Sequence, residues 1–213
     1  MTGSPSTNDI KAAVENAAAE AREFLNDIIP IRSTPGNEHE VIALCGKQFA
    51  SAGCKCDLVE LTDDIVNDPE YSHPETPLAY KGRHNLAAKR AGTGGGRSVI
   101  LQSHADVVPA GDWNEAFDVR QDGDYVIGRG ACDAKGQIAA IWLALKALDD
   151  LHAQLSGDIH AQIVVEEEVG GNGALALIRQ GYRADAVLIA EGTQLQVHPA
   201  NRGAVWFLSL IHI

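Results

Sequence analysis

Residues 99–106 read VILQSHAD, an apolar run that ends in a histidine and an aspartate. The pattern returns twice, because residues 163–168 (IVVEEE) and 187–191 (VLIAE) also place acidic side chains directly after an apolar run. Such short apolar runs are typical of buried strands. In open α/β sheets, ligands bind outside the carboxyl ends of the strands. We therefore expect these polar clusters to meet in one crevice.

The second half of the chain alternates between short apolar runs and segments of helical periodicity. Strands are expected at 84–90, 98–103, 158–165 and 186–190, and helices at 136–151 and 172–180. This alternation predicts an α/β fold with a mostly parallel sheet and flanking helices.

The first half begins with two predicted helices. The spacing of apolar residues over 8–28 predicts an amphipathic helix that packs across the outside of the domain. A second helix is expected over 38–52, with Asn37 as its cap, and a strand over 55–61. Residues 62–83 contain three prolines and no periodicity, which predicts a long surface loop.

The charge balance narrows the classes of function. The 213 residues include 17 lysines and arginines against 29 aspartates and glutamates, a formal net charge of −12, which argues against nucleic-acid binding and a polybasic membrane contact. No signal peptide is recognisable and no apolar run reaches roughly 18 residues, so we expect a cytoplasmic protein with reduced cysteines.

The GTGGGRS run at 92–98 lacks the Gly-Lys-Ser end of a phosphate loop and precedes a strand, which favours a flexible turn.

Each polar cluster also has a plain structural explanation. A His-x-Asp pair at a strand end is often a hydrogen-bonded pair, and a run of glutamates is often a solvated strand end. The three glutamates at 166–168 repel one another, however, and a divalent cation would remove that repulsion. A bound metal ion thus accounts for three adjacent negative charges whose repulsion the structural explanation does not relieve. A fourth candidate, Asp133, lies in a glycine-rich segment just before the helix expected at 136–151.

Four longer blocks occur in this order along the chain: QSHADVVPAGDW at 102–113, GRGACDAKGQIAA at 128–140, VVEEEVGGNGA at 164–174 and LIAEGT at 188–193. They resemble the signature blocks of the aminoacylase, acetylornithine deacetylase and succinyl-diaminopimelate desuccinylase family of two-metal metallopeptidases. Four blocks in register are a far more specific signal than one short motif. The resemblance implies a zinc-peptidase-like catalytic domain over 1–200 and the truncated start of a lid and dimerisation domain over 201–213.

The resemblance also implies a set of metal ligands. His104 and Glu191 match the ligands of one ion, and Asp133 matches the carboxylate that bridges both ions. Glu168 matches a ligand of the second ion. A histidine nitrogen with carboxylate oxygens suits zinc, with cobalt or manganese as replacements, so the expected cofactor is a pair of divalent ions.

Two further residues match positions beside the ions. Asp106 matches the aspartate that hydrogen-bonds the far ring nitrogen of the histidine ligand and so sets its tautomer. Glu167 matches the general base that takes a proton from the attacking water and later delivers it to the leaving amine. Sliding the register of the glutamate triplet by one residue would exchange the roles of Glu167 and Glu168.

The function implied is hydrolysis of an amide bond in an N-acyl amino acid or a similar small substrate. A dipeptidase or carboxypeptidase on the same site is the alternative, and a non-catalytic metal-binding scaffold is the alternative of another class. The expected partner is a small N-acyl amino acid or dipeptide, with no nucleic acid and no membrane, and a homodimer is allowed for the full-length form. Because family members take a further histidine ligand from a block near their C-terminus, we expect the chain as given to be a fragment without useful activity.

Overall fold

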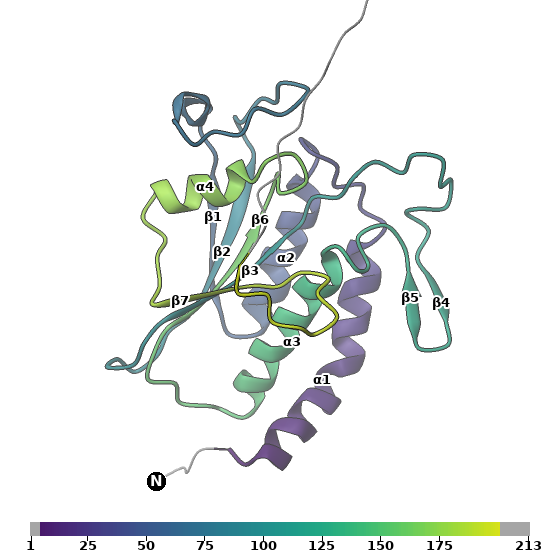
Figure 1. Ribbon diagram of the computed structural model, residues 1–213. Coiled ribbons are helices and arrows are strands. Elements are labelled where there is room, and N and C mark those ends of the chain that lie inside the picture. Colours follow the sequence, from purple (N-terminus) through teal and green to yellow (C-terminus); the bar gives the residue numbers. More distant parts are fainter. Residues whose placement is uncertain (1–4, 201–213) are drawn as a thin grey trace, which may run out of the picture.

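The computed structural model describes residues 5–200, so the lid-domain start expected at 201–213 lies outside the described residues. A five-stranded sheet forms the centre, in the order β1-β2-β6-β3-β7 (Figure 1). The strands are β1 (Lys55–Glu60), β2 (His84–Arg90), β3 (Val99–His104), β6 (Ile159–Val164) and β7 (Ala186–Ile189). Strand β3 pairs in parallel with β6 and β7, whereas β2 pairs antiparallel with both of its neighbours. The sheet is therefore mixed, and β2 alone runs against the other four strands.

The predicted α/β class with flanking helices is confirmed, and the strands and helices expected in the second half lie within one residue of their predicted ends. Strands β3 and β6 are parallel neighbours, with His104 opposite Val164 at their ends. The polar residues that follow both strands consequently begin at the same edge of the sheet, as the sequence pattern predicted.

Two helices, α2 (His39–Ser51) and α3 (Lys135–Asp150), pack on one face of the sheet, and α1 (Thr7–Ile28) packs on α3 from outside (Figure 1). Small buried side chains on α1, Ala13, Ala17 and Ala21, recur every four residues and let the two helices lie close together. Helix α4 (Asn172–Arg179) covers the other face of the sheet, where Leu177 packs in a small apolar cluster with strand side chains. Among residues 5–200, no helix is long and apolar enough to cross a membrane.

Three local features differ from the sequence-based expectations. Glu38, not Asn37, is the N-cap residue of α2, and it makes no side-chain capping bond. The Asn37 amide donates instead to Thr34 Oγ1, over 3.0 Å. The long loop at 62–83 contains a 3₁₀ helix, Asp63–Asn67, and a short exposed hairpin follows the third strand. The hairpin strands, β4 (Arg120–Asp122) and β5 (Tyr125–Ile127), are too short to show a clear alternation in the sequence.

The glycine-rich run at 92–98 is a turn between β2 and β3, as expected, and it lies against Gly157. A Cβ atom on Gly92 would lie 2.5 Å from the carbonyl oxygen of Gly157, and one on Gly96 would lie 2.6 Å from its backbone nitrogen. This close approach of two backbones explains why two of the glycines are needed.

Candidate metal centre

His104 is the last residue of β3, and its imidazole is buried, with 1% of the residue exposed. Nε2 lies 2.9 Å from Asp133 Oδ1. Nδ1 lies 2.9 Å from the backbone oxygen of Asp106, and 3.5 Å from Oδ1 of the same residue. A partner on Nδ1 sets the tautomer of the ring and leaves Nε2 as the atom available to a ligand. The sequence pointed to the Asp106 carboxylate for this contact, and the backbone oxygen is the nearer atom.

Asp133 projects from the segment before α3, and Lys135 holds that segment in place. The ammonium of Lys135 is buried and donates to the carbonyl oxygens of Ile28 and Ile31, both over 2.7 Å, where α1 has just ended. Both carbonyls also accept a backbone N–H, from Ile31 and Ser33, so the lysine adds a charged donor to the turn that follows α1. Burial lowers the pKa of Lys135 to about 8. The Lys135 side chain thus holds the turn on the side away from His104, and its ammonium is not among the groups around that imidazole.

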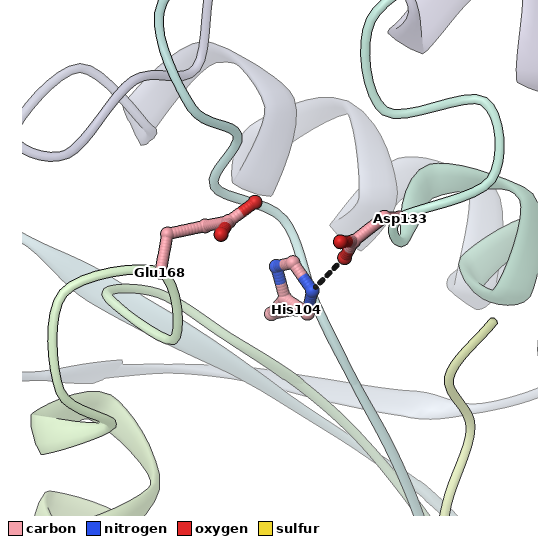
Figure 2. Close-up of side chains that lie close together, drawn as sticks. All are labelled: His104, Asp133 and Glu168. Atoms are coloured by element: carbon pink, nitrogen blue, oxygen red, sulfur yellow. Dashed lines mark hydrogen bonds and ion pairs between the residues drawn. The ribbon is translucent and has the colours of Figure 1, made fainter. Parts of the chain in front are cut away.

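Glu168 approaches the same point from the segment that follows β6. Figure 2 shows its carboxylate and that of Asp133 pointing toward one another, with the imidazole of His104 between them. One ligand atom from each of the three residues lies within 4.8 Å of the other two. His104 is buried, Glu168 is half-buried and Asp133 is exposed, so the cluster opens to solvent on one side. Three side chains from separate segments therefore converge on one place.

The two remaining acidic candidates surround the same imidazole. Glu167 Oε2 lies 3.8 Å and Glu191 Oε1 lies 3.7 Å from His104 Nε2. Glu191 follows β7, which pairs with β3, so the parallel register brings it to this edge of the sheet. All six residues singled out in the sequence are consequently gathered around the end of β3.

Asp106 links the histidine to the glutamate segment. It is fully buried, and its carboxylate accepts the backbone N–H of Glu167 at Oδ1, over 3.1 Å, and that of Glu168 at Oδ2, over 3.0 Å. Both oxygens are thereby used, while Oδ1 remains 3.5 Å from His104 Nδ1. One carboxylate thus sets the position of two glutamates and of the imidazole. The sequence indicated only the contact with His104, because hydrogen bonds to the backbone of residues about 60 positions away leave no local pattern.

The crowding of negative charge changes the proton affinity of the cluster. Burial raises the pKa of Glu168 to about 7, and the negative charge of Asp133 adds to the effect. Burial likewise raises the pKa of Glu167, to which the charge of Glu191 contributes. For His104, burial disfavours the charged ring, but the carboxylates of Asp106 and Glu191 outweigh it and raise the pKa to about 11. A cluster that holds protons this firmly is one in which a divalent cation can take their place.

A buried network behind the cluster was missed in the sequence. Glu166, the first residue of the triplet, is fully buried and faces away from solvent. Its carboxylate accepts hydrogen bonds from Arg83, Tyr80 and Asn172. Arg83 also pairs with the buried Glu38. The partners are widely separated along the chain and come from the loop at 62–83 and the ends of two helices, so no spacing rule could have found them.

The sequence of this chain is similar to those of known hydrolases and peptidases. Residues 100–201 match the family described as peptidase family M20/M25/M40. The N-formyl-4-amino-5-aminomethyl-2-methylpyrimidine deformylase of Bacillus subtilis is 32% identical over 124 residues, which are 55% of this chain and 29% of that protein. Acetylornithine deacetylase of Myxococcus xanthus is 37% identical over 123 residues, which are 56% of this chain and 31% of that protein. The chain spans about a third of the length of these curated relatives.

Solved structures agree on the fold. Human carnosine dipeptidase 1 matches with a TM-score of 0.66 at 17% identity, over 86% of this chain and 41% of that one. At this identity the likeness shows the fold alone. The sequence match covers all four blocks completely, including every candidate residue of the cluster. Residues 100–201 of this chain therefore belong to peptidase family M20/M25/M40, and the resemblance that the four blocks indicated is confirmed.

Proposed function

We propose that this chain provides the metal-binding part of an enzyme that hydrolyses the amide bond of an N-acyl amino acid or a similar small substrate. The observation that carries the proposal is the convergence of His104, Asp133 and Glu168, whose ligand atoms lie within 4.8 Å of one another. One imidazole nitrogen with several carboxylate oxygens is a donor set suited to zinc, and cobalt or manganese can replace it. The pKa shifts support the same conclusion: burial and the charge of Asp133 raise the pKa of Glu168, and the carboxylates of Asp106 and Glu191 raise that of His104 against its burial, a crowding of negative charge that a divalent cation would offset.

In this proposal, His104 and Glu191 would hold one divalent ion and Glu168 the other. Asp133, which is exposed and lies within 4.8 Å of His104 and Glu168, would be shared by both. Bound divalent ions polarise a scissile carbonyl and make an attacking water more acidic.

Glu167 acts as the general base. It takes a proton from the attacking water as the new C–O bond forms, and returns it to the amine nitrogen as the C–N bond breaks. Its carboxylate is about half exposed and 3.8 Å from His104 Nε2, so it reaches the cluster while remaining open to solvent. A raised pKa also suits a group that must hold a proton between the two steps.

The relatives favour removal of an acyl group over cleavage of a peptide. The relatives that are 30% identical or more are named as a deformylase, a deacetylase and a desuccinylase, whereas those named as carboxypeptidases are 26–28% identical. Peptidase activity on the same centre is the second candidate, because carnosine dipeptidase 1 shares the fold. Formyl, acetyl and succinyl amino acids are consequently the first substrates to assay, followed by dipeptides.

The test measures metal binding and turnover separately. The purified chain is titrated with Zn²⁺ and Co²⁺ and then assayed on acyl amino acids, with the Myxococcus xanthus acetylornithine deacetylase as the positive control. Placed in a full-length form of the enzyme, Glu167→Gln should keep its metals and lower turnover by at least about 100-fold, the lower range for a positioned acid-base group. Glu168→Gln should lose metal, and Glu115→Gln, an exposed residue outside the cluster, should behave as wild type.

Two results would count against this assignment. A Glu167→Gln protein that loses a metal, with Glu168→Gln retaining it, would show that the roles within the triplet are exchanged. A wild-type chain that binds neither Zn²⁺ nor Co²⁺ would overturn the metal-centre proposal itself.

A further inference from the structure

Glu166 is a carboxylate that the proposed hydrolysis does not use, although it directly precedes the general base. It is completely buried, and three donors saturate its oxygens. Arg83 Nη1 donates to Oε2, and both the Tyr80 hydroxyl and Asn172 Nδ2 donate to Oε1, each over 2.7 Å. Burying a charge at such a place is unfavourable unless it is paired and hydrogen-bonded. The network therefore calls for an explanation beyond the filling of space.

The backbone of Glu166 supports a positional role. Its φ angle is +66°, a left-handed conformation that side chains other than glycine rarely adopt. Its carbonyl oxygen accepts the N–H of Gly171 over 2.7 Å, which closes the turn that carries Glu167 and Glu168. A non-glycine residue keeps this conformation only where its surroundings hold it, and such residues gather at functional sites. Here the surroundings are the three donors to the Glu166 carboxylate.

The donors themselves are fixed by distant parts of the fold. Arg83 is also bound to Glu38, the N-cap residue of α2, and both of these side chains are buried. The side chain of Asn172 makes two hydrogen bonds with the backbone of Ser72, in the long loop at 62–83. Glu166 is thus tied through these contacts to α2, to the long loop and to the start of α4.

The segment Glu166–Glu168 is held on two sides, by Asp106 next to the metal-binding cluster and by the buried network in the core. On the side of the cluster, Asp106 accepts the backbone N–H groups of Glu167 and Glu168. On the opposite side, the Glu166 carboxylate anchors the same segment in the core. We propose that Glu166 is a positioning residue, which through Arg83, Tyr80 and Asn172 sets the general base and the second-ion ligand against His104. This inference rests on the proposed function, since it assigns a role relative to that centre.

The competing explanation is that the network only stabilises the domain, and a matched pair of variants separates the two. Glu166→Gln and Glu38→Gln each remove one negative partner of the same buried arginine. In both, one of the two carboxylate oxygens is replaced by an NH₂ group, which donates and cannot accept, so the side chain loses its charge and at least one accepted hydrogen bond. Only Glu166, however, adjoins the residues of the cluster. A merely stabilising network predicts equal effects on the centre for equal losses of stability.

The experiment compares three variants of the whole chain by thermal unfolding, Co²⁺ titration and hydrogen exchange of the metal-free protein. We expect Glu166→Gln to weaken Co²⁺ binding by about 10 to 100-fold, as loss of a group that orients metal ligands does. The amides of Glu167 and Glu168 should exchange faster in this variant. Glu38→Gln should lower the melting temperature to a similar extent but change Co²⁺ affinity and the exchange of these two amides much less, because the Glu166 carboxylate keeps all three of its donors. Tyr80→Phe, which removes a single hydroxyl donor, should weaken Co²⁺ binding in the same direction by less, and it decides the matter if Glu166→Gln does not fold.

The outcomes distinguish this inference from the function on which it rests. If Glu166→Gln and Tyr80→Phe bind Co²⁺ as wild type does, or if Glu38→Gln weakens binding equally, the network is structural and the positioning role is overturned. Metal binding by the wild-type chain and turnover of a full-length form could still support the proposed function in that case. If the wild-type chain binds no Co²⁺, both the function and this inference fail.

Discussion

Replacement of Asp106 by asparagine tests the link between the histidine and the glutamates. The wild-type carboxylate is fully buried and accepts two backbone N–H groups, one at each oxygen, over 3.1 and 3.0 Å. Asparagine keeps the shape but has only one accepting oxygen. Its NH₂ group must then face either the N–H of Glu167 or that of Glu168, so one backbone donor is left without an acceptor.

The magnitude follows from the lost contact. A hydrogen bond to a charged acceptor contributes about 1.5–3 kcal/mol, and a buried donor left unsatisfied costs about 1–3 kcal/mol. The two values describe partly the same loss and are not simply added, so we expect the free energy of unfolding to fall by roughly 2–4 kcal/mol. At about 2–4 °C per kcal/mol for a chain of this size, the melting temperature should fall by roughly 4–16 °C. Metal affinity should fall by about 10 to 100-fold, because the shift moves the Glu168 ligand and the contact to His104.

The assay combines thermal unfolding of the metal-free chain with Zn²⁺ titration of Asp106→Asn. Asp185→Asn is the matched control, because Asp185 also accepts a backbone N–H, from Ser98 over 2.7 Å, but is exposed and distant from the cluster in the fold. The control should leave Zn²⁺ affinity unchanged. If Asp106→Asn binds Zn²⁺ as tightly as wild type, or loses as much affinity as Asp133→Ala, then Asp106 does not act as the link described above.

The ligands themselves allow two further predictions. His104→Ala should chiefly weaken one metal site, whereas Asp133→Ala should weaken both because a bridging carboxylate is shared, and equal metal contents in a stoichiometric titration of the two variants would contradict this. Metal affinity should also rise with pH, because a pKa of about 7 for Glu168 and about 11 for His104 means that both groups hold protons in acid and must release them on binding. The logarithm of the association constant should rise by about two units per pH unit below pH 7 and by about one above it. Calorimetric titrations between pH 6 and 8 measure the slope, and a flat profile would be inconsistent with these protonation states.

Much of the fold could be predicted because its signals are local. Apolar runs such as residues 99–103 and 186–190 mark strands by their composition, and helical periodicity marked α3 and α4 to within one residue. The direction of β2 could not be predicted, since pairing depends on contacts with β1 and β6 across the sheet. Hairpin β4–β5 was missed because strands of three residues each are too short to show a clear alternation.

The family resemblance of residues 100–201 and the acidic and histidine side chains at the strand ends could be read from the sequence alone. This was possible because the four blocks keep their order and intervals, and because each cluster directly follows its strand. How those side chains are held in place became visible in the folded structure. Asp106 accepts hydrogen bonds from two backbone N–H groups about 60 positions away, and Arg83 donates to Glu166, which lies 83 positions away. Hydrogen bonds over such separations depend on the folded path of the chain, and no spacing of residues along the sequence encodes them in a readable way.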